Sequence, residues 1–152
     1  MATYVFLDCG PLTLACKGRN NPKAIACRAW IEGLRGKDFI VVIPEIADYE
    51  ARREMIRIGA DDWIARLDGL TSHVFYLRLT TDAMRQAARF WALVRKVGLP
   101  TADKEALDAD AILAAQAVTA AQPGDRVIVA TTNIGHLGRF PGVEPQPWDF
   151  VQ

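Results

Sequence analysis

Short apolar runs typical of buried strands alternate along the chain with longer segments typical of helices, and this alternation constrains the fold most. We expect strands at residues 3–7, 39–43, 73–79 and 126–130, and a short edge strand near Val143. Strand–helix alternation is typical of a parallel sheet with helices on both faces, because each parallel connection has to cross over the sheet. The sequence therefore predicts an α/β fold, a three-layer α/β/α sandwich with a central parallel sheet of four to five strands.

Glycine, proline and capping residues mark the ends of the predicted helices. Pro22 suits a first helical turn, Gly59 is a good stop, and Gly98-Leu99-Pro100 ends the helix before it. The expected helices span residues 11–16, 22–34, 44–58, 61–67, 80–97 and 104–122. The proline-rich tail after residue 130 is expected to be mostly irregular. Without repeats, linkers or low-complexity tracts, we expect one domain over residues 1–152.

Composition excludes several classes of protein. Of the 152 residues, 51% are hydrophobic and 24% are charged, as in soluble globular proteins. No apolar stretch reaches the roughly 18 residues that span a membrane, and the N-terminus does not resemble a signal peptide, so we expect a cytoplasmic protein without membrane contact. The three cysteines have no CxxC spacing and are expected to be reduced, packed thiols.

The charge balance argues against binding of nucleic acid by bulk charge. The chain has 18 basic and 18 acidic residues, which leaves room only for a local basic patch. Candidates for such a patch are Lys17, Arg19 and Lys23 in one loop and Arg52 and Arg53 on a predicted helix.

An acid follows the first predicted strand directly. Strand interiors avoid aspartate, so Asp8 marks either a turn or a site. In open α/β sheets, ligands bind outside the carboxyl ends of the strands, where Asp8 would lie. The run Thr131-Thr132-Asn133 follows another strand in the same way, although Thr-Asn alone is ordinary turn chemistry.

A second acid interrupts the apolar face of the alanine-rich helix at 104–122. At 100° per residue, Asp110 shares its face with Leu107, Leu113, Ala114, Ala117, Val118 and Ala121. A buried carboxylate needs a cation, a basic side chain or backbone donors as its partner. Asp108 lies about 160° away and suits a helix-start role better.

The helix at 44–58 carries four acids, of which Glu50 borders the apolar side. Glu45 is rotated about 140° from Glu50 and lies in the first turn, where any acid favours the helix dipole. Arg53 and Arg57 are close enough to pair with Glu50 and Glu54. The residues alone are therefore also consistent with an ordinary charged helix that faces solvent.

Four segments, in this order, resemble the motifs of the PIN domain, the nuclease fold of VapC-type toxins. V-F-L-D resembles the first strand and first acid, Asp8. I-P-E-I-A-D-Y-E-A-R-R-E resembles the second motif and selects Glu50, and L-D-A-D-A-I-L-A-A-Q-A resembles the third and selects Asp110. V-A-T-T-N-I-G-H-L-G-R-F-P-G-V resembles the fourth, and it puts Asn133 where many members carry a fourth acid.

The resemblance covers nearly the whole chain and implies an endoribonuclease that depends on Mg²⁺ or Mn²⁺. It implies Asp8, Glu50 and Asp110 as metal ligands, and Thr132 or Asn133 as groups that orient a water or the scissile phosphate. It also implies an RNA substrate, an antitoxin protein as a partner, and a homodimer. Hard oxygen ligands such as these carboxylates favour Mg²⁺ or Mn²⁺.

Asn133 departs from the family pattern. Asparagine removes one negative charge, so the sequence does not decide whether a second metal site exists. Together with the zero net charge, this departure motivates an alternative function, a catalytically weak PIN-like domain that binds RNA or protein. A third hypothesis is a flavodoxin-like phosphoacceptor domain that uses Asp8, but it does not explain the apolar setting of Asp110.

Overall fold

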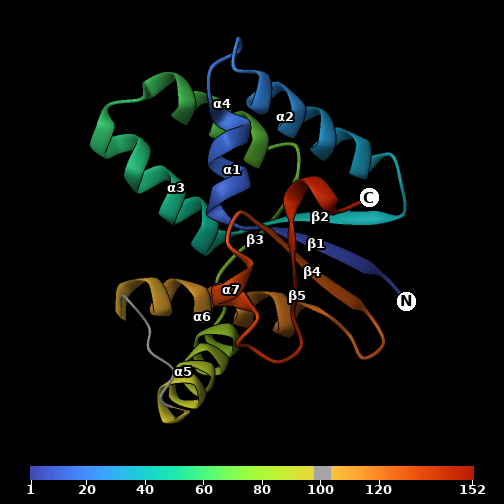
Figure 1. Ribbon diagram of the computed structural model, residues 1–152, viewed down its shortest axis with the longest axis vertical. Coiled ribbons are helices and arrows are strands. Elements are labelled where there is room, and N and C mark those ends of the chain that lie inside the picture. The colour runs from blue at the N-terminus through green and yellow to red at the C-terminus, as the bar shows by residue number, and fades with distance from the viewer. Residues whose placement is uncertain (98–103) are drawn as a thin grey trace.

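A five-stranded sheet separates two layers of helices in the computed structural model (Figure 1). The structure describes residues 1–97 and 104–152, with the backbone alone for residues 104–106. The strands are β1 (Thr3–Leu7), β2 (Phe39–Pro44), β3 (Phe75–Leu77), β4 (Arg126–Thr131) and β5 (Glu144–Pro147). The helices are α1 (Cys9–Cys16), α2 (Pro22–Arg35), α3 (Glu45–Ile58), α4 (Asp61–Thr71), α5 (Thr81–Lys96), α6 (Lys104–Ala120), α7 (Ile134–Leu137) and the 3₁₀ turn η1 (Trp148–Phe150).

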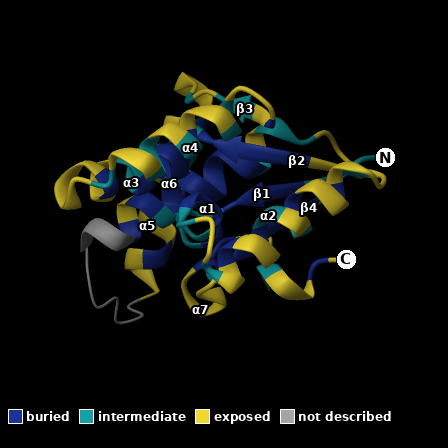
Figure 2. Ribbon diagram, turned by 90° about the horizontal axis from the view of Figure 1, so that it is seen from above, coloured by how far each residue is buried: buried dark blue, intermediate teal, exposed yellow. Residues whose placement is uncertain are grey.

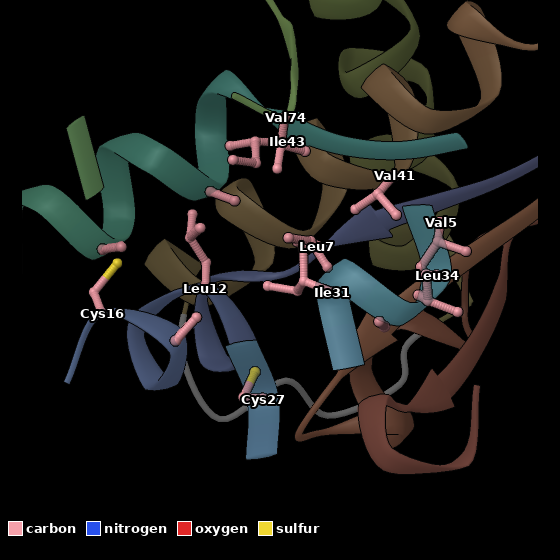
Figure 3. Close-up of a cluster of buried hydrophobic side chains, with 14 of the residues drawn as sticks. Val5, Leu7, Leu12, Cys16, Cys27, Ile31, Leu34, Val41, Ile43 and Val74 are labelled. Carbon is pink, nitrogen blue, oxygen red and sulfur yellow. The ribbon is translucent and has the colours of Figure 1, made fainter. Parts of the chain in front are cut away.

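All strand pairs of the sheet are parallel, in the order β3-β2-β1-β4-β5. Successive side chains of a strand face opposite sides, so each buried strand contributes to two cores. In β1, Val5 and Leu7 pack among α1, α2, α3 and α4, whereas Phe6 packs against α6 on the other face. Figure 3 shows the first core, in which Leu12 and Ile31 lie over β1, and Figure 2 shows buried strands between half-exposed helices. The predicted three-layer parallel fold is confirmed.

The strand order leaves a switch point between β1 and β4. The chain proceeds from β1 to β2 and β3 on one side, and β4 and β5 are added on the other. Ligand sites of open parallel sheets lie at the carboxyl ends of strands at such a point. Flavodoxin-like sheets have the order 2-1-3-4-5, so the phosphoacceptor hypothesis does not fit this sheet.

Several boundaries differ from the sequence prediction. The strand expected at 73–79 is only Phe75–Leu77, and the helix expected to end near residue 67 continues to Thr71. The tail, expected to be mostly irregular, contains α7, β5 and η1. The break expected at 98–100 lies outside the described residues. Within the described ranges, none of the helices is both long and apolar enough to span a membrane.

Candidate active site

Asp8 is held at the switch point by hydrogen bonds in three directions. Its backbone N–H donates to the carbonyl of Ala130 at 3.0 Å, which continues the pairing of β1 with β4. Its side chain caps α1, because Oδ1 accepts from the backbone N–H of Cys9 at 2.8 Å. Its Oδ2 accepts from the hydroxyl of Thr131 at 2.7 Å. The carboxylate of Asp8 is therefore fixed by both β4 and α1.

Thr131 is a contact that the sequence analysis missed. It is fully buried, and its hydroxyl both donates to Asp8 and accepts from the backbone N–H of Asn133 at 3.0 Å. The sequence pointed to Thr132 and Asn133, but only the register of β1 on β4, in which Leu7 pairs with Ala130, puts Thr131 beside Asp8. Thr131 thus links the first acid to the loop before α7.

Thr132 and Asn133 are both exposed, and they differ in their contacts. A Cβ atom on Gly10 would lie 2.5 Å from Oγ1 of Thr132, so the first turn of α1 packs directly on this threonine, and a side chain at position 10 would displace it. Asn133 takes part through its backbone, and no described residue shares a hydrogen bond with its side chain. Asn133 therefore does not supply the negative charge that an acid would bring to this position.

Glu50 approaches Asp8 from the second turn of α3. Its side chain is 17% exposed, and its Oε2 lies 3.9 Å from Nη2 of Arg53. Burial, and then the negative charges of Asp8 and Asp110, raises the pKa of Glu50 to about 7. The elevated pKa indicates that the weak ion pair with Arg53 does not compensate the neighbouring acids.

Asp110 enters the site from α6. Its Oδ2 is buried and accepts no hydrogen bond from any described residue. Nδ1 of His136 lies 3.4 Å away, and Nη2 of Arg139 lies 3.8 Å away. Burial, and then the charge of Asp8, raises the pKa of Asp110 to about 6, although His136 and Arg139 act in the opposite direction. The structure thus confirms that this acid is largely buried on α6, and its role as a metal ligand stays a prediction.

These three residues, Asp8, Glu50 and Asp110, are called the acidic cluster below. Within it, one oxygen each of Asp8 and Glu50 and the sulfur of Cys9 lie within 4.8 Å of one another, and Asp110 lies outside this tightest group. Burial, and then Asp8 and Glu50, raises the pKa of the Cys9 thiol. Cys9 therefore remains a neutral thiol and adds no fourth negative charge.

A cavity of about 1000 Å³ opens beside the acidic cluster and is called the groove below. Glu50 and Thr132 line it at the cluster, and Lys17, Lys23 and Arg53 line it as well. These three are among the residues expected to contact a nucleic-acid backbone.

Other residues singled out in the sequence have structural contacts instead. Arg52 pairs with Asp48 at 3.0 Å and with Asp68 at 2.8 Å, so it is not a groove residue. Oε1 of Glu45 accepts from the backbone N–H of Leu79 at 2.9 Å, which ties α3 to the segment after β3. Asp108, two residues before Asp110 on α6, is exposed.

The acidic cluster fits a hard divalent cation. Two of its carboxyls have raised pKa values, first because they are buried and then because they lie near other acids, and one buried oxygen of Asp110 has no hydrogen-bond donor among the described residues. A cation with oxygen ligands would relieve both conditions. The donor set of carboxylates fits Mg²⁺ or Mn²⁺ better than a soft metal, given the neutral thiol of Cys9.

No protein-family model and no curated protein matches the chain. Solved structures do match it. VapBC from Salmonella typhimurium bound to DNA has a TM-score of 0.69 at 19% identity, covering 97% of this chain and 99% of that chain. VapBC2 from Rickettsia felis bound to a promoter DNA fragment has a TM-score of 0.68 at 13% identity, covering 94% and 98%. VapBC-1 from nontypeable Haemophilus influenzae has a TM-score of 0.64 at 19% identity, covering 96% and 98%.

The similarity to these structures over nearly their full length gives the chain a PIN-like fold of the VapC type. At identities of 13–19%, the matches show the fold alone. The resemblance inferred from the four sequence motifs is thus confirmed for the fold, and the function has to be argued from the acidic cluster.

Proposed function

We propose that the protein is a metal-dependent endoribonuclease in which Asp8, Glu50 and Asp110 bind Mg²⁺ or Mn²⁺. The observation that carries the proposal is the convergence of three acids on the switch point, Asp8 between β1 and α1, Glu50 from α3 and Asp110 from α6, with raised pKa values for Glu50 and Asp110. Acids that face one another in a folded protein cost stability, so their presence together favours a site for a cation.

A bound divalent cation would supply activation of a water for attack on a phosphodiester and stabilisation of the developing charge. The residues of the chain prepare the site for this chemistry. Thr131 and the first turn of α1 fix the carboxylate of Asp8, and α3 and α6 bring Glu50 and Asp110 toward it. Thr132, packed on Gly10 at the groove, is suited to orient a water or the scissile phosphate, as is Asn133 in the adjacent loop.

The groove supports RNA as the substrate. Lys17, Lys23 and Arg53 line it, and they can neutralise backbone phosphates of a single strand next to the acidic cluster. Glu54 and Asp149 also line the groove, so the basic groups act locally and not as a broad positive surface. A local patch agrees with the net charge of zero.

We further propose that the chain is a single domain and that it is the toxin of a toxin–antitoxin pair. In this proposal the protein binds an antitoxin protein and forms a homodimer. The three similar solved structures are VapBC proteins, which motivates the antitoxin. Exposed apolar side chains on α3 and α5, such as Ile56 and Trp91, offer surface for a second copy. Light scattering of the purified chain tests the dimer directly.

Cleavage of a labelled RNA with Mn²⁺ or with EDTA tests the nuclease. The wild type should cleave only with the metal, and both Asp8→Asn and Asp110→Asn should lose at least about a hundredfold in rate. Asp108→Asn, which changes an exposed acid on α6, is the matched control and should cleave normally. Equal trace cleavage by the wild type and both variants would refute the enzyme.

The second candidate is a PIN-like module that binds RNA or protein with little catalysis. The neutral Asn133 at the fourth motif favours it, because the site then has one charge fewer for a second metal ion. Retention of labelled RNA by the wild type in Mn²⁺, without cleavage, would favour this candidate.

A further inference from the structure

Arg139 is a nearly buried cation beside the acidic cluster. It lies within the segment that resembles the fourth motif, but it has no assigned role there and is not one of the proposed metal ligands. Its side chain is 14% exposed, although arginine is seldom buried without a partner. It lies in the segment after α7, and its Nη2 is 3.8 Å from Oδ2 of Asp110.

Two contacts fix the guanidinium of Arg139 independently of the acid. Its Nε donates to the carbonyl of His136 at 2.9 Å, and its guanidinium carbon lies 5.8 Å from the ring centroid of Phe140. Phe140 is itself buried and packs on Phe90 of α5. The position of the cation is therefore set by the carbonyl of His136 and by Phe140, which packs in the core between α5 and α6.

The contact of Arg139 with Asp110 is too long to satisfy either group. Nη2 lies 3.8 Å from Oδ2 of Asp110, beyond hydrogen-bond distance, and the acceptor oxygen has no donor among the described residues. In the described part of the chain, Nη1 and Nη2 donate no hydrogen bond. A planar fork of fixed donors at the edge of an acidic site is suited to the oxygens of a phosphate.

We propose that Arg139 is a catalytic residue that binds a non-bridging oxygen of the scissile phosphate as negative charge develops there. This inference rests on the proposed nuclease function. The fixed geometry of the guanidinium means that little reorganisation is needed when the substrate binds.

This role has a signature that a structural ion pair does not have. A cation beside Asp110 repels a divalent ion bound to the same carboxylate, so Arg139→Gln should bind Mn²⁺ as tightly as the wild type or more tightly, by up to roughly tenfold. The same variant should lose roughly a hundredfold in kcat, because a donor to the developing charge is absent. Arg139→Lys should recover part of the rate, since it keeps the charge and loses the fork.

The experiment measures Mn²⁺ binding by calorimetry, cleavage of a labelled RNA at saturating Mn²⁺, and the melting temperature. Arg126→Gln is the matched control, because Arg126 pairs with Glu144 at the start of β4, five residues or roughly 16 Å from Thr131 along the strand. It should leave Mn²⁺ binding and kcat unchanged.

A loss of kcat in Arg139→Gln with Mn²⁺ binding retained supports the proposal. Unchanged kcat overturns it, and so does a joint loss of Mn²⁺ binding, melting temperature and kcat without recovery in Arg139→Lys, since Arg139 would then be structural. A wild type that neither binds Mn²⁺ nor cleaves RNA overturns the nuclease itself and this inference with it.

Discussion

Replacing Glu50 with glutamine should stabilise the protein in the absence of metal. The pKa of Glu50 is raised from 4.5 to about 7, first by burial and then by the charges of Asp8 and Asp110. The folded protein therefore holds this proton to a higher pH than the unfolded chain does. Its free energy of unfolding accordingly decreases as the pH rises from about 4.5 to about 7, and the full loss is present above pH 7.

The size of the effect follows from the same pKa values. At about 1.4 kcal/mol for each tenfold change in proton affinity, the ionised Glu50 costs about 3 kcal/mol above pH 7. Glutamine avoids this cost and gives up the 3.9 Å ion pair with Arg53, which contributes less than about 1 kcal/mol. The net gain of about 2–3 kcal/mol corresponds to a rise of roughly 5–10 °C in Tm for a domain of this size.

Thermal unfolding in EDTA at pH 8 and pH 5 measures this gain. Glu50→Gln should be more stable than the wild type at pH 8, whereas the difference should be much smaller at pH 5, where Glu50 of the folded protein is protonated. Glu54→Gln is the control, because Glu54 lies one turn further along α3 and its pKa is lowered by its hydrogen bonds with Arg57. It should give no stabilisation at pH 8.

Added Mn²⁺ provides the second half of the test. A ligand that binds the folded state raises its stability in proportion to the logarithm of its concentration over Kd, so Mn²⁺ should stabilise the wild type more than Glu50→Gln. The reasoning is wrong if Glu50→Gln is less stable than the wild type at pH 8 in EDTA, or if its gain is the same at pH 5.

Three further substitutions test individual contacts. Thr131→Val should lower the free energy of unfolding by about 1–3 kcal/mol and slow cleavage, because the carboxylate of Asp8 and the N–H of Asn133 both lose their partner. Thr131→Ser should retain both the stability and the rate, and urea unfolding and cleavage assays measure the two properties separately. Gly10→Ala should lower the stability by about 1 kcal/mol, because the new Cβ would lie 2.5 Å from Oγ1 of Thr132. The same change in a Thr132→Ala background should be neutral or stabilising. Equal losses of stability in both backgrounds would contradict the packing argument. Asp48→Ala should lower the free energy of unfolding by about 2 kcal/mol, because Asp48 is 8% exposed and accepts hydrogen bonds from Tyr76 and Arg52. Cleavage per folded molecule should not change. A specific loss of rate would give Asp48 a role in the site.

The sequence predicted the layers of the fold and the members of the acidic cluster for different reasons. The strands were predictable because apolar runs such as Phe39–Ile43 fill both faces of a sheet, and Asp110 was predictable because it interrupts an apolar helix face. The tail was predicted less well. Its four-residue helix α7 and strand β5 are too short for periodicity, and β5 contains two prolines that edge strands tolerate.

The contacts around the cluster could not be read from the sequence, because they depend on register and packing. Thr131 reaches Asp8 through the pairing of β1 with β4, and Arg139 reaches Asp110 only because α7 and Phe140 set its position. Arg52 and Arg53 are neighbours in sequence, yet they face different surfaces, one toward Asp68 and the other toward the groove. Helical position alone does not distinguish their partners.

The pairing of β1 with β4 has a consequence for when the acidic cluster is completed during synthesis. The first acid is made at residue 8, but its hydroxyl partner is made at residue 131, and β1 has a free edge until β4 inserts beside it. The contact spans 123 positions of the chain, among the slowest kinds of contact to form in folding. A chain that ends before β4 therefore has all three acids of the acidic cluster, but it has neither the edge partner of β1 nor the hydroxyl that fixes the carboxylate of Asp8.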